Sequence, residues 1–400
     1  MRRKLLFLIA DGMGDYPLDE LGGKTPMEKA DTPNMDLAAR QGRIGRCRTI
    51  PQGMPPGSDI ANMALMGYDP RRDHTGRGPI EAAAQGLQVG PEDLIYRMNL
   101  CSVTRYDPAG TMLDHSGGHI QSDQARELIR RLQAALDNTT FSIVPGFQYR
   151  HLLVQRGGAR SMEADLDIPP PHDILNQSLA HAISRYDSSR LLGPMVRQAA
   201  SLLQEDFNGT RVNTIWPWGQ GQALNLEAFQ SRFSLSGGIV SAVDLVKGLG
   251  RAAGMTVPDI ETATGLLDTD YQAKVSATRS LLAGHDFVFV HLEGPDECGH
   301  AGNTQDKIEA IQRFDQFIVG PLLETLSEVQ GGCVIACDHL TPIVHRTHTS
   351  DPVPFLFLDL SARTDSKVHT FNESVAAQSS LFLDRGEDLL PFVLDAMDRT

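Results

Sequence analysis

The sequence predicts an α/β fold whose mostly parallel sheet is flanked by helices, and three observations support this prediction. Short apolar runs rich in Val, Ile, Leu and Phe recur without polar alternation, as strands buried in a parallel sheet do. Helical patterns separate these runs. A middle segment of different character interrupts the alternation, and the α/β pattern resumes after it. The chain of 400 residues therefore accommodates two domains, the smaller inserted in the larger.

The expected elements follow in chain order. Five apolar runs indicate buried parallel strands, at 4–10, 237–242, 287–292, 333–336 and 355–360. Helical patterns occupy 36–41, 59–66, 243–253, 270–282 and 307–329. In the middle, strands with better alternation are expected at 96–106 and 149–155, with a strong helix at 122–136. The larger domain thus comprises 1–95 and 212–400, and the inserted domain comprises 96–211.

Charge and cysteine content exclude several classes of protein. With 36 Lys and Arg against 50 Asp and Glu, the net charge of −14 gives no basic footprint for nucleic acid or an anionic membrane. The apolar run after the basic N-terminus ends at Asp11-Gly12, too soon for a signal peptide, and no run is long enough to span a bilayer. Five cysteines form no disulfide framework, and Cys333 and Cys337 are better explained as a buried strand residue and a chance neighbour than as a metal pair. We therefore expect a cytoplasmic protein.

Carboxylate and imidazole side chains follow the predicted strands. In an open α/β sheet, ligands bind at the carboxyl ends of the strands, so groups from different strands converge at one edge. A single Asp after a strand is usually a turn or cap residue, but three such endings are much harder to attribute to chance. Oxygen and nitrogen donors without thiolate favour Mn²⁺ or Zn²⁺ over Cu(I) or iron–sulfur, and suit two cations acting on a phosphoryl group. The residues concerned are Asp11, Asp296, His300, Asp338, His339 and His348.

Ser58 lies between a Pro- and Gly-rich loop and a helical pattern. One interpretation is a helix cap, the commonest use of Ser and Asp at such a position. The other is a serine nucleophile, because free N–H groups and the helix dipole favour a phosphate there. A metal at the same place would lower the pKa of the hydroxyl. The residues leave both interpretations open, and Ser58 can serve as both.

These motifs together resemble the cofactor-independent phosphoglycerate mutases, in particular the archaeal-type branch, which includes bacterial members described as proposed homoserine kinases. All belong to the alkaline phosphatase superfamily. The matching strings run in family order over essentially the whole chain. They are ADGMGD (10–15), PGSDIAN (56–62), LMGYDP (65–70), YRH (149–151), WPWGQG (216–221), DECGH (296–300), DH (338–339) and HT (348–349).

The resemblance implies two divalent metal ions, with Mn²⁺ expected and Zn²⁺, Co²⁺ or Mg²⁺ as alternatives. Asp11, Ser58, Asp338 and His339 match the ligands of one metal, and Ser58 also matches the residue phosphorylated during turnover. Asp296, His300 and His348 match the ligands of the second metal. His348 is preferred to the neighbouring His345 because its downstream context resembles the family pattern, and His291 and Glu293 are expected to orient ligands.

The substrate side also follows from the resemblance. A phosphorylated three-carbon acid carries about three negative charges, counting its phosphate and carboxylate. An acidic protein needs local cations to hold it, and arginine suits such groups. The expected substrate-binding residues are Arg77, Arg97, Asn99, Arg150 and Lys274. Asp114 and His119 of the string DHSGGH (114–119) are candidates for general acid and base chemistry, although a Gly-rich turn would use the same residues.

The expected activity is therefore that of a 2,3-bisphosphoglycerate-independent phosphoglycerate mutase, a glycolytic and gluconeogenic isomerase that works through a phosphoserine. Departures in the inserted domain keep two alternatives open, a phosphotransferase with another acceptor such as homoserine and a metal-dependent phosphomonoesterase. No Walker motif or Gly-x-Gly-x-x-Gly fingerprint predicts nucleotide use. Trp216 and Trp218 are expected in the core. The expected partner is a small phosphorylated acid, and no oligomeric state is indicated.

Overall fold

The chain folds into two compact units, seen in a computed structural model that describes residues 3–205, 209–362 and 368–398. The larger unit comprises Met1–His74 and Asn225–Thr400, and the smaller comprises Thr75–Leu224. The smaller unit extends beyond the expected 96–211 at both ends. It does so because helix α5 (Arg77–Ala84) packs on strand β3 (Leu94–Val103), and strand β7 (Thr214–Gln222) pairs with β3 along its length.

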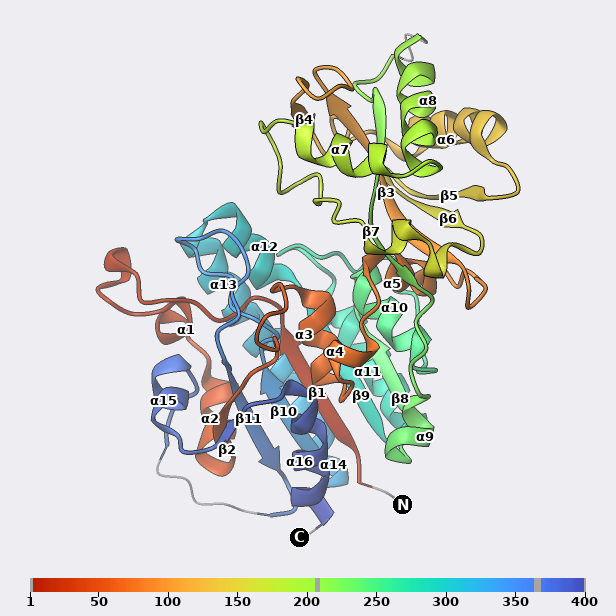
Figure 1. The fold of residues 1–400 in the computed structure, drawn as a ribbon. Coiled ribbons are helices and arrows are strands. Elements are labelled where there is room, and N and C mark those ends of the chain that lie inside the picture. Colours follow the sequence, from red (N-terminus) through yellow and green to blue (C-terminus); the bar gives the residue numbers. More distant parts are fainter. Residues whose placement is uncertain (1–2, 206–208, 363–367, 399–400) are drawn as a thin grey trace. The chain divides into compact units, whose positions relative to one another are not determined.

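A mostly parallel sheet forms the centre of the larger unit (Figure 1). Within the described residues its strand order is β12-β2-β11-β10-β1-β9-β8. The four strands β10, β1, β9 and β8 are mutually parallel and fully buried, which confirms the expected fold class. Their apolar side chains on both faces require covering layers, which the helices supply. The strands are β1 (Leu5–Ala10), β2 (Arg43–Cys47), β8 (Gly237–Val240), β9 (Phe287–Leu292), β10 (Gly332–Ala336), β11 (Val353–Asp359) and β12 (Phe382–Leu383).

Strand β11 corrects one prediction. The sequence predicts a strand at 355–360 that is parallel to the others, but β11 is antiparallel to β10. To pair in parallel with β10, the chain must first cross back to the end where β10 begins, usually through a helix. Residues 337–352 form an irregular loop instead. The start of β11 therefore lies at the edge where β10 ends. This reversal brings the loop that contains His348 to that edge.

Helices lie on both faces of the sheet (Figure 1). The helix expected at 307–329 is interrupted by a π-helical turn at Asp315–Val319, just before Pro321, whose missing N–H disturbs the regular ladder. The helices of this unit are α1 (Pro26–Lys29), α2 (Pro33–Gln41), α3 (Ser58–Leu65), α4 (Pro70–Asp73), α9 (Phe229–Phe233), α10 (Asp244–Ala252), α11 (Tyr271–Gly284), α12 (Gly294–Ala301), α13 (Thr304–Phe314), α14 (Gly320–Val329), α15 (Glu373–Gln378) and α16 (Leu389–Asp398).

The smaller unit is an antiparallel sheet covered by helices. Its described strands run in the order β4-β3-β6-β5, and β7 pairs with the other side of β3. The remaining strands are β4 (Met112–Asp114), β5 (Phe141–Phe147) and β6 (Arg150–Gln155), and the helices are α6 (Ser122–Leu136), α7 (Ala180–Ser188) and α8 (Leu192–Glu205). Helix α6 matches the expected 122–136. Trp216 and Trp218 belong to the core, as predicted.

All five cysteines are buried and unpaired. Across the part of the chain that the structure describes, no helix has the length and apolar character needed to cross a membrane.

Candidate metal centre

The carboxyl ends of three adjacent strands converge on one group of side chains. Strands β10, β1 and β9 are neighbours in the sheet and run in the same direction. Asp11 follows β1, while Asp338 and His339 follow β10. Helix α12 begins two residues after β9 and contributes Asp296 and His300, which its period places on one face. The topology of the sheet thus assembles residues that lie up to 328 positions apart in the sequence, from Asp11 to His339.

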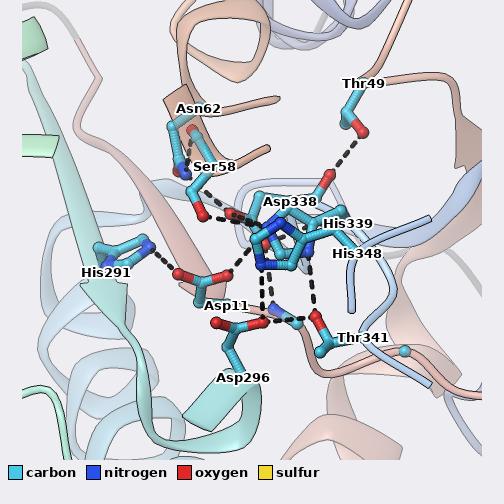
Figure 2. Close-up of polar contacts among 12 residues, drawn as sticks. Asp11, Thr49, Ser58, Asn62, His291, Asp296, Asp338, His339, Thr341 and His348 are labelled. Carbon is cyan, nitrogen blue, oxygen red and sulfur yellow. Dashed lines mark hydrogen bonds and ion pairs between the residues drawn. The ribbon is translucent and has the colours of Figure 1, made fainter. Parts of the chain in front are cut away.

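The first triad consists of Asp11, Asp338 and His339, and all three side chains are buried. Their ligand atoms lie within 4.8 Å of one another. His339 Nε2 is 3.4 Å from Asp11 Oδ1 and 3.5 Å from Asp338 Oδ2. Figure 2 shows these groups pointing toward a common centre.

The second triad consists of Asp296, His300 and His348, again with ligand atoms within 4.8 Å of one another. His300 Nε2 is 3.2 Å from Asp296 Oδ2, and His348 Nε2 is 3.5 Å from Asp296 Oδ1. The Nε2 atoms of the two imidazoles are 2.9 Å apart. His345, the neighbour of His348, instead lies against the ring of Tyr16 and takes no part in the triad.

Ser58 is the first residue of helix α3, which follows the Pro- and Gly-rich loop. Its Oγ is 3.1 Å from His339 Nε2, beside the first triad (Figure 2). The Ser58 side chain makes no capping hydrogen bond, because Gly57 occupies the N-cap position. The hydroxyl is therefore not used as a cap, and it lies at the start of the helix, the end that favours an anion.

The donor set fits divalent cations. Within the described residues, Asp11, Asp296 and Asp338 are buried without an ion pair to any lysine or arginine. Asp11 Oδ1 is buried and has no hydrogen-bond partner among the residues that the structure describes. A buried carboxylate needs a cation or a proton to neutralise its charge. Two imidazole nitrogens that face each other can both bind the same cation. The two triads thus suit two divalent metal ions.

The pKa shifts of the triad residues also result from burying carboxylates close to one another and to imidazoles. Burial, followed by the charges of Asp338 and Asp296, raises the pKa of Asp11 well above its usual range. Burial also opposes ionisation of Asp296, but hydrogen bonds with His300 and His348 outweigh it and hold the pKa of Asp296 well below its usual range. Burial lowers the pKa of His300, yet Asp296 more than offsets this and raises it to about 9. Without metal, protons on Asp11 and His300 thus reduce the negative charge of the buried carboxylates, and bound cations would do this in their place.

The expected substrate residues of the smaller unit form a cluster of cations and aromatic rings. Arg97 is buried, and its Nη1 lies 2.5 Å from Glu81 Oε1, while Arg77 Nε lies 3.3 Å from the same oxygen. Both guanidinium groups lie over the ring of Trp218, at 5.8 Å for Arg77 and 5.1 Å for Arg97. Burial lowers the pKa of Arg97 to about 10, with Glu81 acting in the opposite direction.

Asn99 and Arg150 extend this cluster. Asn99 Oδ1 accepts hydrogen bonds from Arg97 Nε and from Trp218 Nε1, at 3.2 and 3.1 Å. The Arg150 guanidinium lies 5.7 Å from the ring of Tyr149 and forms no ion pair with any described residue. With three arginines and one carboxylate, the cluster has excess positive charge suited to a multiply charged anion.

The other candidate residues have different surroundings. Lys274 belongs to helix α11 of the larger unit, is buried, and donates to the carbonyl of His291 at 2.9 Å. Burial lowers the pKa of Lys274 to about 8. Asp114 accepts hydrogen bonds from the backbone of Ser116 and Gly118, so its carboxylate holds the Gly-rich turn. His119 is exposed at φ +54° on the same turn.

Comparison with known proteins identifies the family. Residues 39–208 match a family model described as 2,3-bisphosphoglycerate-independent phosphoglycerate mutase. A probable enzyme of that name from Geobacter sulfurreducens is 40% identical over 402 residues, covering 98% of this chain and 100% of the relative. The chain belongs to this family.

Further similarities span nearly all of the chain or all of it. The 2,3-bisphosphoglycerate-independent phosphoglycerate mutase of Methanosarcina barkeri is 39% identical over 403 residues, covering 98% of this chain and 100% of the relative. Among solved structures, a protein of Pyrococcus horikoshii has 28% identity and a TM-score of 0.81, covering 100% of this chain and 98% of that one. The sequence-based recognition of the family is thereby confirmed.

Sequence reasoning assigned no role to several residues that support the triads of this family member. Asn62 Nδ2 donates to Asp338 Oδ2 at 2.8 Å, and Thr49 donates to the Asp338 carbonyl at 2.5 Å. Lys307 Nζ donates to Asp15 and to two backbone carbonyls near the triads. Only Asn62, four residues after Ser58 on one helical face, had a local signal. His291, which was expected to orient a ligand, has its Nε2 3.2 Å from Asp11 Oδ2.

Proposed function

We propose that this protein interconverts 3-phosphoglycerate and 2-phosphoglycerate without a bisphosphoglycerate cofactor, by transferring the phosphoryl group to Ser58 and back. The observation that carries the proposal is the position of the Ser58 hydroxyl. It makes no helix-capping hydrogen bond, and its Oγ lies 3.1 Å from His339 Nε2 of the first triad. Full-length similarity to enzymes named for this reaction supports the choice of substrate.

Asp11, Ser58, Asp338 and His339 would hold one divalent cation, and Asp296, His300 and His348 would hold the other. Mn²⁺ is the proposed ion, because the mixed set of carboxylates and imidazoles suits it. When bound, the cations supply neutralising charge for the phosphoryl oxygens and lower the pKa of a nearby hydroxyl.

In the forward half of the reaction, Ser58 Oγ forms a bond to phosphorus while the bond from phosphorus to the substrate oxygen breaks. The N–H groups at the start of helix α3 favour the negative phosphoryl group. In the second half, the other hydroxyl of the bound glycerate takes the phosphoryl group from the phosphoserine, and Ser58 is regenerated. Each half moves one proton from an attacking hydroxyl and one to a leaving oxygen. Asp114 and His119 remain the predicted groups for these transfers.

Arg77, Arg97, Asn99 and Arg150 are proposed to bind the anionic groups of the substrate. Arginine forks match carboxylate and phosphate geometry, and Glu81 holds two of these side chains in fixed positions. The role expected for Lys274 has less support, because its ammonium already binds the His291 carbonyl. Lys274 is therefore better suited to fixing the end of strand β9.

Phosphorus NMR of the purified protein with Mn²⁺ and 3-phosphoglycerate tests the proposal, with no bisphosphoglycerate or nucleotide added. Formation of 2-phosphoglycerate with little free phosphate is expected. Free phosphate as the main product would instead indicate a phosphomonoesterase. No reaction would contradict the mutase assignment, and a second incubation with ATP and homoserine would then test the phosphotransferase alternative.

A further inference from the structure

One hydroxyl group touches both triads. Thr341 is fully buried, and its Oγ1 donates a hydrogen bond to Asp296 Oδ1 of the second triad. The same Oγ1 is 3.2 Å from His339 Nδ1 of the first triad. Figure 2 shows dashed lines that join Thr341 to both of these side chains.

The two hydrogen bonds of Thr341 Oγ1 determine which ring nitrogen of His339 carries a hydrogen. A threonine hydroxyl carries one hydrogen, and an ionised carboxylate can only accept. Since the Thr341 hydrogen goes to Asp296, the hydroxyl oxygen can only accept from His339, and Nδ1 must carry a hydrogen. In the neutral imidazole, the lone pair then resides on Nε2, the nitrogen nearest Ser58 and Asp11.

The surroundings hold the Thr341 side chain in this orientation. A Cβ at Gly12 would lie 2.6 Å from Thr341 Oγ1, and a Cβ at Gly299 would lie 2.8 Å from Thr341 Cγ2, so both glycines pack closely around it. The Thr341 carbonyl also accepts a hydrogen bond from Lys307 Nζ at 2.8 Å. The hydroxyl and methyl groups therefore cannot exchange places without disturbing the neighbouring loops.

We propose that Thr341 is a positioning residue that couples the two metal triads, by fixing the Nδ1–H tautomer of His339 and the orientation of the Asp296 carboxylate through one hydroxyl. The inference rests on the metal centre of the proposed function. Because one side chain serves a ligand of each triad, its loss should weaken both metal sites together. A change confined to one ligand, such as His300→Ala, should weaken mainly its own site.

The matched pair Thr341→Val and Thr341→Ser tests this coupling. Valine keeps the shape and removes the hydroxyl, whereas serine keeps the hydroxyl. Mn²⁺ titration of the metal-free proteins, followed by electron paramagnetic resonance of the free ion, gives both dissociation constants without any need for turnover. We expect Thr341→Val to weaken both sites by about 10- to 100-fold, the usual cost of losing a group that orients a metal ligand. Thr341→Ser should restore most of the affinity.

Thr278→Val is the control for loss of a buried hydroxyl in the same unit. Thr278 is fully buried, and its Oγ1 donates a hydrogen bond to the Lys274 carbonyl within helix α11, at 2.8 Å. Its Mn²⁺ affinities should match those of the wild type. Equal losses in Thr278→Val and Thr341→Val, or a loss at one site only in Thr341→Val, would overturn the coupling.

The tautomer is measured on the wild-type protein, so this test does not depend on whether a variant folds. Long-range ¹H–¹⁵N spectra of histidine-labelled, metal-free protein should show His339 as Nδ1–H, assigned by its absence in His339→Gln. A signal from the Nε2–H form would overturn the proposal. If the wild type binds no Mn²⁺ at all, the metal centre fails and the proposal fails with it. If it binds two ions but lacks mutase activity, only the proposed reaction fails.

Discussion

The two units concentrate opposite charges in their candidate sites. Among the described residues of the larger unit, Asp11, Asp296 and Asp338 are buried with imidazoles and have no lysine or arginine partner. In the smaller unit, three arginines lie against aromatic rings, and the carboxylate of Glu81 pairs with two of them, Arg77 and Arg97. The first group needs cations and the second needs an anion. Neither set of charges is neutralised by its own unit, so each unit should bind a ligand of the opposite charge.

The difference also concerns how each group is held. The triads lie at strand ends and are fixed by buried hydrogen bonds from Thr49, Asn62 and Thr341. The arginine cluster lies on two neighbouring strands of the smaller unit and on helix α5, which packs against them. A buried ion pair and cation–π contacts hold it in place. Metal binding should therefore be insensitive to changes in the cluster, and substrate affinity should be sensitive to them.

The largest effect is expected from Ser58→Ala, which removes the proposed nucleophile from the larger unit. Turnover should fall by about 10⁴-fold or more, because the variant lacks the hydroxyl proposed to carry the phosphoryl group. Mn²⁺ affinity should stay within roughly tenfold of the wild type, since the carboxylates and imidazoles remain. Ser327→Ala, at an exposed serine of helix α14, is the control. Turnover near that of the wild type in Ser58→Ala would contradict the mechanism.

Lys307→Met tests the support of the larger unit. The Lys307–Asp15 ion pair is fully buried, and the ammonium also binds the carbonyls of Gly14 and Thr341. Its removal leaves a buried carboxylate uncompensated, so urea unfolding should show a loss of about 3–5 kcal/mol. Lys247→Met is a matched control, because the one ion pair of Lys247 within the described part of the chain is with Asp244, at 4.0 Å. Equal stabilities of the two variants would show that the buried pair has no special role.

Arg97→Lys separates the two units functionally. Lysine keeps the charge but loses the planar fork that meets Glu81 and Asn99. We expect KM for 3-phosphoglycerate to rise by about 10- to 100-fold, with Mn²⁺ affinity unchanged. Arg105→Lys, at an exposed arginine of the same unit, should have little effect. A loss of Mn²⁺ affinity in Arg97→Lys would contradict the separation of roles.

A last effect, which appears only at acidic pH, concerns the stability of the smaller unit. Burial lowers the pKa of His151 to about 4, and its Nδ1 accepts a hydrogen bond from the Gly146 N–H. The unfolded chain binds this proton below about pH 6.5, so stability falls as the pH drops from there toward 4, by at most about 3 kcal/mol. His151→Asn keeps an acceptor and should lack this loss, as read by hydrogen exchange of β5 and β6. The exposed His181→Asn should retain it. A pH profile of His151→Asn identical to that of the wild type would exclude His151 as the cause.

Much of the site could be predicted from the sequence, because ligand residues directly follow apolar runs. Asp11 after β1, and Asp338 and His339 after β10, needed only the rule that parallel strands share a carboxyl edge. Ser58 at the start of a helix was equally local. Lys307 gave no such signal, since a lysine in an amphipathic helix normally reaches solvent. Its burial depends on Asp15, which lies 292 residues away.

The sequence by itself determined the α/β class, the residue types at the strand ends and the helix that begins at Ser58, because these features depend on local periodicity and burial. Only the tertiary structure decided that β11 runs antiparallel and returns His348 to the edge where β10 ends. It also decided that Thr341 bridges the two triads and that Glu81 pairs with Arg97. Strand direction and long-range hydrogen bonds arise from packing of distant segments, which no local pattern encodes.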